Sequence, residues 1–96
     1  MQPVLIDGEW RPSDARDVFR AVNPSTGEGF DAEYPVSSSA DLEAAIEAGH
    51  RAVRELRTTP ADRLAAFLDG YADGLMENAA NLAAVAHDET GLAYEP

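Results

Sequence analysis

The sequence predicts an α+β fold in which two N-terminal β-hairpins are followed by two or three amphipathic helices. Two observations support this fold class. Up to Pro35, short apolar runs are separated by turn-forming Gly, Pro and Asn residues, as is typical of hairpins. From Ser38 onward, apolar residues recur at the 3.6-residue spacing of a helix face. We therefore divide the chain into a strand region, residues 1–37, and a helical region, residues 38–96.

The first hairpin is expected around Asp7 and Gly8. The apolar run Val4–Ile6 leads into this pair, which suits the two positive φ angles of a type I′ turn. The chain then returns through Glu9 and Trp10. The Trp10 ring could line a ligand pocket, but we expect it to anchor the hairpin against another layer of the protein.

A second strand pair is expected around the turn Asn23–Gly27. The polar connection 11–17 precedes this pair, and the residues around the turn alternate until Pro35 ends the strand. Two isolated hairpins are marginal in water, because stability needs three or more strands or a covering helix layer. These strands therefore require packing partners.

The first helix is expected to begin after Ser38, whose hydroxyl can cap it. Asp41 lies in the first turn, where the helix dipole favours a negative charge. The residues that recur at helical spacing are Leu42, Ala45, Ile46, Gly49, Val53 and Leu56. This pattern predicts an amphipathic helix.

The second helix is expected to have Thr59 as its cap and Pro60 at its first position, with Asp62 in the first turn. Its predicted apolar face consists of Leu64, Phe67, Leu68, Tyr71, Ala72, Leu75 and Met76. A third helical piece either continues from the second or starts afresh at Asn78 or Asn81, and we favour a break near Asn78. Gly91 is expected to end this piece, because Gly reaches the left-handed conformation at no steric cost.

Composition excludes several classes of function. Eighteen acidic residues against seven arginines give a net charge of −11, which repels nucleic-acid phosphates and anionic lipid head groups. The chain has no cysteine, so it offers no disulfide, thiolate metal site or cysteine nucleophile. The first residues lack a signal-peptide pattern, and no stretch approaches the roughly 20 apolar residues of a membrane span. We expect a cytoplasmic protein that binds neither nucleic acid nor membrane.

Three motifs resemble functional sites, and each has a simpler interpretation. Residues 27–32, GEGFDA, satisfy a dinucleotide-binding pattern, but Pro35 follows where that pattern requires a helix, so we predict a turn and strand. Glu47 and His50 have metal-ligand spacing, but a bundle site needs further pairs, so we predict a solvated helix face. Residues 87–89, His-Asp-Glu, point in different directions and are expected to form a helix end. No residue is assigned a catalytic, cofactor-binding or metal-binding role.

Five stretches, in order, carry a resemblance to a known family. They are LIDGEW, FRAVNPSTGE, YPVSSSADLEAAIEAGHRAV, PADRLAAFLDGYADGL and ETGL. Together they resemble the N-terminal segment of the NAD(P)-dependent aldehyde dehydrogenase superfamily, from about residue 4 to the end. Asn23–Pro24 with Thr26–Glu28, and Glu89–Gly91, are the most specific parts. YPVSS and ETGL look more like the branch that oxidises α-ketoglutaric semialdehyde (2,5-dioxovalerate).

The resemblance implies a single incomplete domain, part of the α/β aldehyde dehydrogenase fold, whose helices pack on the cofactor-binding domain of a larger enzyme. That enzyme would use NAD or NADP, and the family's nucleophilic Cys, general-base Glu and nicotinamide-binding strands lie downstream. In the family a thiolate attacks the aldehyde, hydride passes to NAD(P)⁺ and the thioester is hydrolysed. The chain alone is therefore expected to be inactive.

The expected partners are the remainder of that dehydrogenase or another copy of this chain, and the whole enzyme is expected to be a homo-oligomer. The alternative is a stand-alone interaction module or an inactive remnant. In that case the helix faces and strand edges would dock onto another protein.

Overall fold

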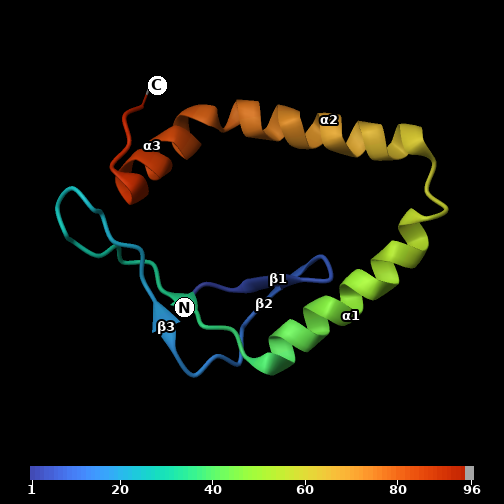
Figure 1. Ribbon diagram of the computed structural model, residues 1–96, viewed down its shortest axis with the longest axis horizontal. Coiled ribbons are helices and arrows are strands. Elements are labelled where there is room, and N and C mark those ends of the chain that lie inside the picture. The colour runs from blue at the N-terminus through green and yellow to red at the C-terminus, as the bar shows by residue number, and fades with distance from the viewer. Residues whose placement is uncertain (95–96) are drawn as a thin grey trace. The chain divides into compact units, whose positions relative to one another are not determined.

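The computed structural model describes residues 1–94, whose strands and helices are drawn in Figure 1. The chain divides into two compact units. One unit contains residues 1–21 and 29–58, and the other contains residues 22–28 and the chain from Thr59 onward. The elements in chain order are β1 (Val4–Ile6), β2 (Glu9–Arg11), β3 (Val18–Phe19), β4 (Tyr34–Pro35), α1 (Ser39–Leu56), α2 (Ala61–Glu77) and α3 (Ala79–Thr90). Two small antiparallel strand pairs followed by three helices confirm the predicted fold class.

The first hairpin forms where the sequence predicts it. Strands β1 and β2 pair in antiparallel register, with Leu5 opposite Trp10. Asp7 and Gly8 have φ angles of 55° and 77°, as a type I′ turn requires. The Asp7–Gly8 pair therefore sets this register.

Helix α1 begins at the predicted cap. The Ser38 side chain accepts a hydrogen bond from the backbone N–H of Asp41 at 3.1 Å. One side of the helix lies beside β1, and the small residues Ala45 and Ala48 lie on that side. Arg51 on the same helix forms an ion pair with Asp7 at 2.9 Å.

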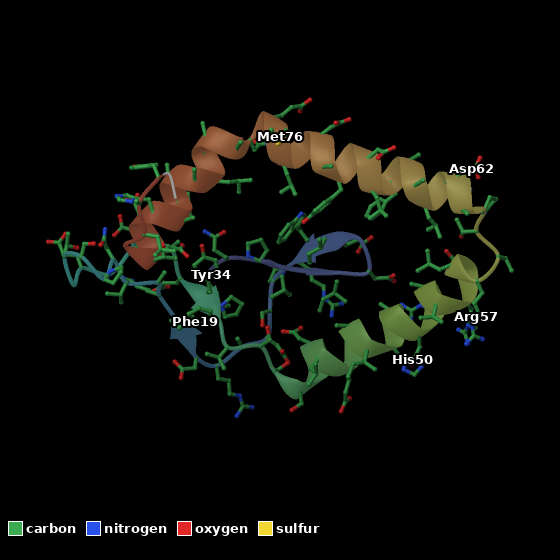
Figure 2. The ribbon with its side chains drawn as sticks, turned by 45° about the horizontal axis from the view of Figure 1, so that its top comes forward. Phe19, Tyr34, His50, Arg57, Asp62 and Met76 are labelled. Carbon is green, nitrogen blue, oxygen red and sulfur yellow. The ribbon has the colours of Figure 1, made fainter. Side chains whose placement is uncertain are left out.

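The second strand pair is shorter than the predicted alternation. Val18 lies opposite Pro35 and Phe19 lies opposite Tyr34, and the two aromatic rings stack at a centroid separation of 5.6 Å (Figure 2). The polar turn between the strands is held by its own hydrogen bonds, with the Gly27 N–H donating to the Asn23 carbonyl at 2.8 Å.

The start of α2 corrects one expectation. Pro60, not Thr59, occupies the N-cap position, and the helix begins at Ala61. The physical reason is the Pro60 backbone, whose ψ of 142° is extended while its carbonyl already accepts the N–H groups of Arg63 and Leu64. Asp62 lies in the first turn as predicted.

The break between α2 and α3 and the end of α3 both match the sequence. Asn78 leaves the helical conformation, with φ −102° and ψ 9°, so one helix ends at Glu77 and the next begins at Ala79. Gly91 adopts the left-handed conformation with φ 69°, and its N–H donates to the His87 carbonyl at 2.9 Å. The predicted break and the predicted Gly cap are confirmed.

Very little apolar surface is buried in the described part of the chain. Ile6 and Ala48 are its only buried hydrophobic side chains. On α2 the predicted apolar face is exposed; Phe67, Leu68 and Tyr71 are 67%, 63% and 63% accessible. None of the helices within residues 1–94 is long and apolar enough to cross a membrane.

Candidate functional site

The most buried polar group lies at the N-terminal turn of α1. Asp41 is 7% accessible, and one of its carboxylate oxygens accepts a 2.5 Å hydrogen bond from the Ser13 hydroxyl. Arg11 lies 3.8 Å from the other oxygen. The cap residue Ser38 in turn donates to the carboxylate of Asp14. These five residues form what we call the α1 polar joint.

The α1 polar joint has the chemistry of a structural connection. A serine nucleophile needs a general base that removes its proton and a third group that orients that base, and here Ser13 donates directly to a carboxylate. Ser13 also accepts the backbone N–H of Ala15 at 3.1 Å, and the backbone N–H of Asp41 donates to the Ser38 hydroxyl at the start of α1. The joint therefore ties residues 11–14 to the helix.

Sequence reasoning placed Asp41 in the first turn of α1 but missed its contact with Ser13. Ser13 lies in the polar connection 11–17, which has no periodicity that could indicate a buried position. A buried carboxylate needs hydrogen-bond donors from elsewhere in the chain. Nothing in the sequence marks Asp41 as buried among the eighteen acidic residues, so no signal pointed to this contact.

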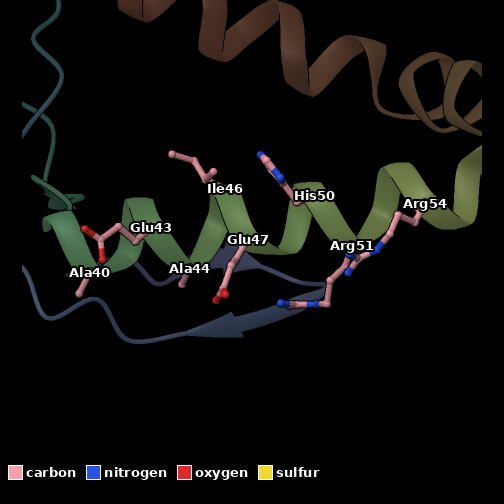
Figure 3. A pocket seen from close by; sticks show the side chains of 8 residues that line it. All are labelled: Ala40, Glu43, Ala44, Ile46, Glu47, His50, Arg51 and Arg54. Carbon is pink, nitrogen blue, oxygen red and sulfur yellow. The ribbon is translucent and has the colours of Figure 1, made fainter.

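The outer face of α1 carries Glu47 and His50, the pair with metal-ligand spacing. The shallow surface around them is lined by residues of α1 alone (Figure 3). Figure 3 shows that the Glu47 and His50 side chains diverge. A surface built from one helix does not enclose a ligand, so the predicted solvated face is the better interpretation.

His87 is held in local contacts at the end of α3. Its Nδ1 atom lies 2.5 Å from the Leu92 carbonyl oxygen, and its ring stacks on Tyr94 at 4.2 Å. Among residues 1–94, no group of three or more His, Asp or Glu side chains is arranged to hold a metal ion. The predicted helix end at residues 87–89 is confirmed.

Residues 27–32 do not fit the pyrophosphate of a nicotinamide cofactor. Gly27 ends a turn with φ 77°, and the chain continues into β4 rather than into a helix. Phosphates in dinucleotide sites are held by the N–H groups at a helix N-terminus. The predicted turn is confirmed, but residues 27–32 themselves form an irregular connection, and the strand begins only at Tyr34.

The exposed ion pair between Arg20 and Glu33 shifts the pKa values of both side chains. A hydrogen bond from Arg20 to Glu33, 2.6 Å long, and the attraction between their charges lower the pKa of the Glu33 carboxyl and raise the pKa of Arg20. The pair is exposed to solvent and flanks the β3–β4 ladder, since Arg20 follows β3 and Glu33 precedes β4.

Trp10 does not anchor the first hairpin within the described chain. Its side chain is 69% accessible, and its cross-strand neighbour Leu5 is 54% accessible. The two therefore form a small exposed apolar patch on the hairpin.

Comparison with known proteins gives a consistent result. The profile of the "Aldehyde dehydrogenase family" matches residues 10–95. Malonate-semialdehyde dehydrogenase 2 of Geobacillus thermodenitrificans is 38% identical over 91 residues, covering 95% of this chain and 19% of the relative. A 3-sulfolactaldehyde dehydrogenase of Pseudomonas putida is 32% identical, with coverage of 94% and 18%. A hydroxyisobutyraldehyde dehydrogenase of Mycolicibacterium austroafricanum is 34% identical, with coverage of 92% and 17%.

The chain spans about one-fifth of the length of the curated relatives that it matches. No solved structure matches it significantly.

Proposed function

Because this chain belongs to the aldehyde dehydrogenase family, we propose that it serves as the N-terminal structural part of an NAD(P)-dependent enzyme that oxidises an aldehyde to a carboxylic acid. The 96 residues supply scaffold and no reacting group. The matches to dehydrogenases cover nearly all of this chain but only about one-fifth of each relative, which supports this role.

The observation that carries the proposal is the exposed apolar face of α2. Leu68 and Tyr71 on this face are each 63% accessible, and Met76 is 75% accessible (Figure 2). A contiguous apolar face of this kind on a soluble chain marks a surface that another protein layer covers. We propose that residues 38–96 cover the cofactor-binding domain of the enzyme and that this contact buries the face. Glu95 and Pro96 lie outside the described residues.

The same reasoning assigns the strand region a role at the edge of the enzyme. Both strand pairs are two-stranded, so residues 1–37 present unpaired backbone groups at their edges. We propose that the remainder of the dehydrogenase, or a second subunit of a homo-oligomer, pairs with or covers these edges in the cytoplasm.

For the substrate, we propose an aldehyde that also carries an acidic group, with α-ketoglutaric semialdehyde as the first candidate. Two of the relatives are named for malonate semialdehyde and 3-sulfolactaldehyde, which supports this class. An assay of the complete gene product with α-ketoglutaric and malonate semialdehydes, each with NAD⁺ and NADP⁺, separates these substrates and cofactors.

A chimera tests the scaffold role directly. Residues 1–96 replace the matched segment of the Geobacillus thermodenitrificans malonate-semialdehyde dehydrogenase 2, and the chimera is assayed with malonate semialdehyde. We expect a folded, active enzyme. Leu68→Asp in the chimera should abolish soluble, active protein, because it places a charge in the buried contact.

Ala66→Asp is the matched control, since it introduces the same side chain two residues away, on the opposite side of α2. It should leave activity intact. An inactive chimera, together with a compact monomeric 96-residue chain, would favour a stand-alone interaction module. Equal effects of the two Asp substitutions would show that the α2 face is not covered.

A further inference from the structure

The C-terminal end of α3 approaches the Asn23–Gly27 turn very closely. A Cβ atom added at Gly91 would lie 3.2 Å from the Ser25 hydroxyl oxygen and 3.3 Å from Pro24 Cγ. Ordinary contacts between non-bonded heavy atoms lie at about 3.5–4.0 Å. A side chain at residue 91 would therefore have to displace the turn by a few tenths of an ångström.

The turn is a preformed surface for this contact. The Asn23 side-chain oxygen accepts the backbone N–H groups of Ser25 at 2.9 Å and Thr26 at 3.3 Å. The Gly27 N–H donates to the Asn23 carbonyl at 2.8 Å. These bonds, with the fixed φ of Pro24, hold the turn without help from the rest of the chain.

The residues that follow α3 fold back onto the C-terminal end of that helix. The Leu92 N–H donates to the Thr90 hydroxyl at 3.2 Å, and the Leu92 carbonyl contacts His87 Nδ1 at 2.5 Å. Tyr94 then stacks on the His87 ring at 4.2 Å. Each of these contacts depends on the left-handed conformation of Gly91, which turns the backbone back toward the helix end.

We propose that the Asn23–Gly27 turn and the C-terminal end of α3 form an intrachain contact, which we call the clasp. In the clasp, Gly91 packs directly against the turn. Gly91 is then required for two independent reasons: its positive φ and the absence of a Cβ against the turn. The clasp positions Leu92–Tyr94 relative to the turn. This inference uses only contacts within residues 22–28 and 59–94 and does not depend on the proposed dehydrogenase.

Hydrogen exchange of single amides in the complete gene product, measured by mass spectrometry with residue-level fragmentation, tests the clasp. Gly91→Ala should lower the protection of the Ser25, Thr26 and Gly27 amides by about tenfold or more, because the added Cβ pushes the turn away and strains the backbone. Gly8→Ala is the matched control: Gly8 has φ 77° and nothing within 4 Å of an added Cβ. It should leave the three turn amides unchanged.

Gly91→Asn separates the contact from the backbone strain, since Asn tolerates the left-handed conformation but still carries a Cβ. It should also lower the protection of the turn amides. Ser25→Ala combined with Gly91→Ala should restore part of that protection, because it removes the nearest opposing atom. Unchanged turn amides in both Gly91 variants, or turn amides that exchange at unfolded-chain rates before any substitution, would overturn the clasp.

Discussion

The Arg20–Glu33 pair gives a residue-scale prediction about pH. The hydrogen bond from Arg20 lowers the pKa of Glu33 from its ordinary value of 4.5. A carboxyl whose pKa is depressed by folding stabilises the folded chain above its unfolded pKa, and that contribution is lost as pH falls through the folded pKa. Arg20→Ala should therefore raise the pKa of Glu33, measured by ¹³C NMR titration of its carboxyl carbon.

Arg51→Ala is the control for this titration, because it removes a different exposed arginine pair, the one with Asp7. It should leave the Glu33 titration unchanged. The difference between the two variants should shrink at high salt, since both pairs are exposed to solvent. If Arg20→Ala leaves the pKa of Glu33 unchanged, Arg20 is not the cause of its lowered pKa.

Gly8 carries a second residue-scale prediction. Its φ of 77° lies in the region that a β-branched residue avoids, so Gly8→Val should disrupt the β1–β2 hairpin. The measurement is the set of cross-strand nuclear Overhauser contacts between Leu5 and Trp10, which should be lost. Gly49→Val is a useful comparison, because it changes a helical glycine with open space around its Cβ; the hairpin contacts should survive better there.

Several residues were predictable because their structural roles are local. Asp7 and Gly8 define a turn, Ser38 caps a helix and Gly91 ends one, and each does so through atoms within four residues. The Ser13–Asp41 bond was not predictable, because it joins two distant parts of the chain and leaves no periodic trace in the sequence. Local backbone chemistry can be read from one segment, whereas pairing between segments cannot.

At the scale of elements, we expect the Ser38 cap of α1 to contribute measurably to the free energy of unfolding. Ser38→Ala removes the acceptor for the Asp41 N–H and should lower the free energy of unfolding by about 1 kcal/mol. Ser37→Ala, at the exposed neighbour, should have little effect. Denaturant unfolding followed by circular dichroism gives both values, and equal losses for the two variants would show that the cap does not stabilise the helix.

The helices were easier to predict than their surroundings. Periodicity located the helical segments, and Asn78 marked the favoured break between the second and the third. The cap residues placed the start of α2 one residue early, because Pro60 fits both the N-cap and the first helical position. Periodicity also placed Leu42 and Ile46 on the apolar face of the first helix, and both are exposed in the described chain. An apolar face shows that a helix packs against something, but it does not identify the packing partner.

At the scale of the whole molecule, we predict that the purified 96-residue chain has no dehydrogenase activity. It contains no cysteine to form the thiolate, and residues 27–32 do not form a phosphate-binding turn. Incubation with NAD⁺ or NADP⁺ and a panel of aldehydes should produce no reduced cofactor above a buffer control. Activity that persists through repurification would contradict the scaffold role.

The same chain should not behave as a stable monomer. Burial of apolar surface contributes roughly 25 cal/mol per Å², whereas ordering costs about 1.5 kcal/mol per residue. Within residues 1–94, Ile6 and Ala48 are the only buried hydrophobic residues, so the chain has little margin. We expect association or partial unfolding in sedimentation and small-angle scattering. A compact, monodisperse monomer with a sharp cooperative melt would instead favour an independent small domain.

The exposed face of α2 changes how variants of this gene should be interpreted. Leu68 is 63% accessible in the chain, so a rule based on accessibility would class a polar substitution there as harmless. In the proposed enzyme the same position lies in an interior, where such a substitution costs several kcal/mol, on the order of other core replacements. A saturation mutagenesis map of the complete gene should therefore show Leu68 and Tyr71 tolerating as few replacements as Ile6.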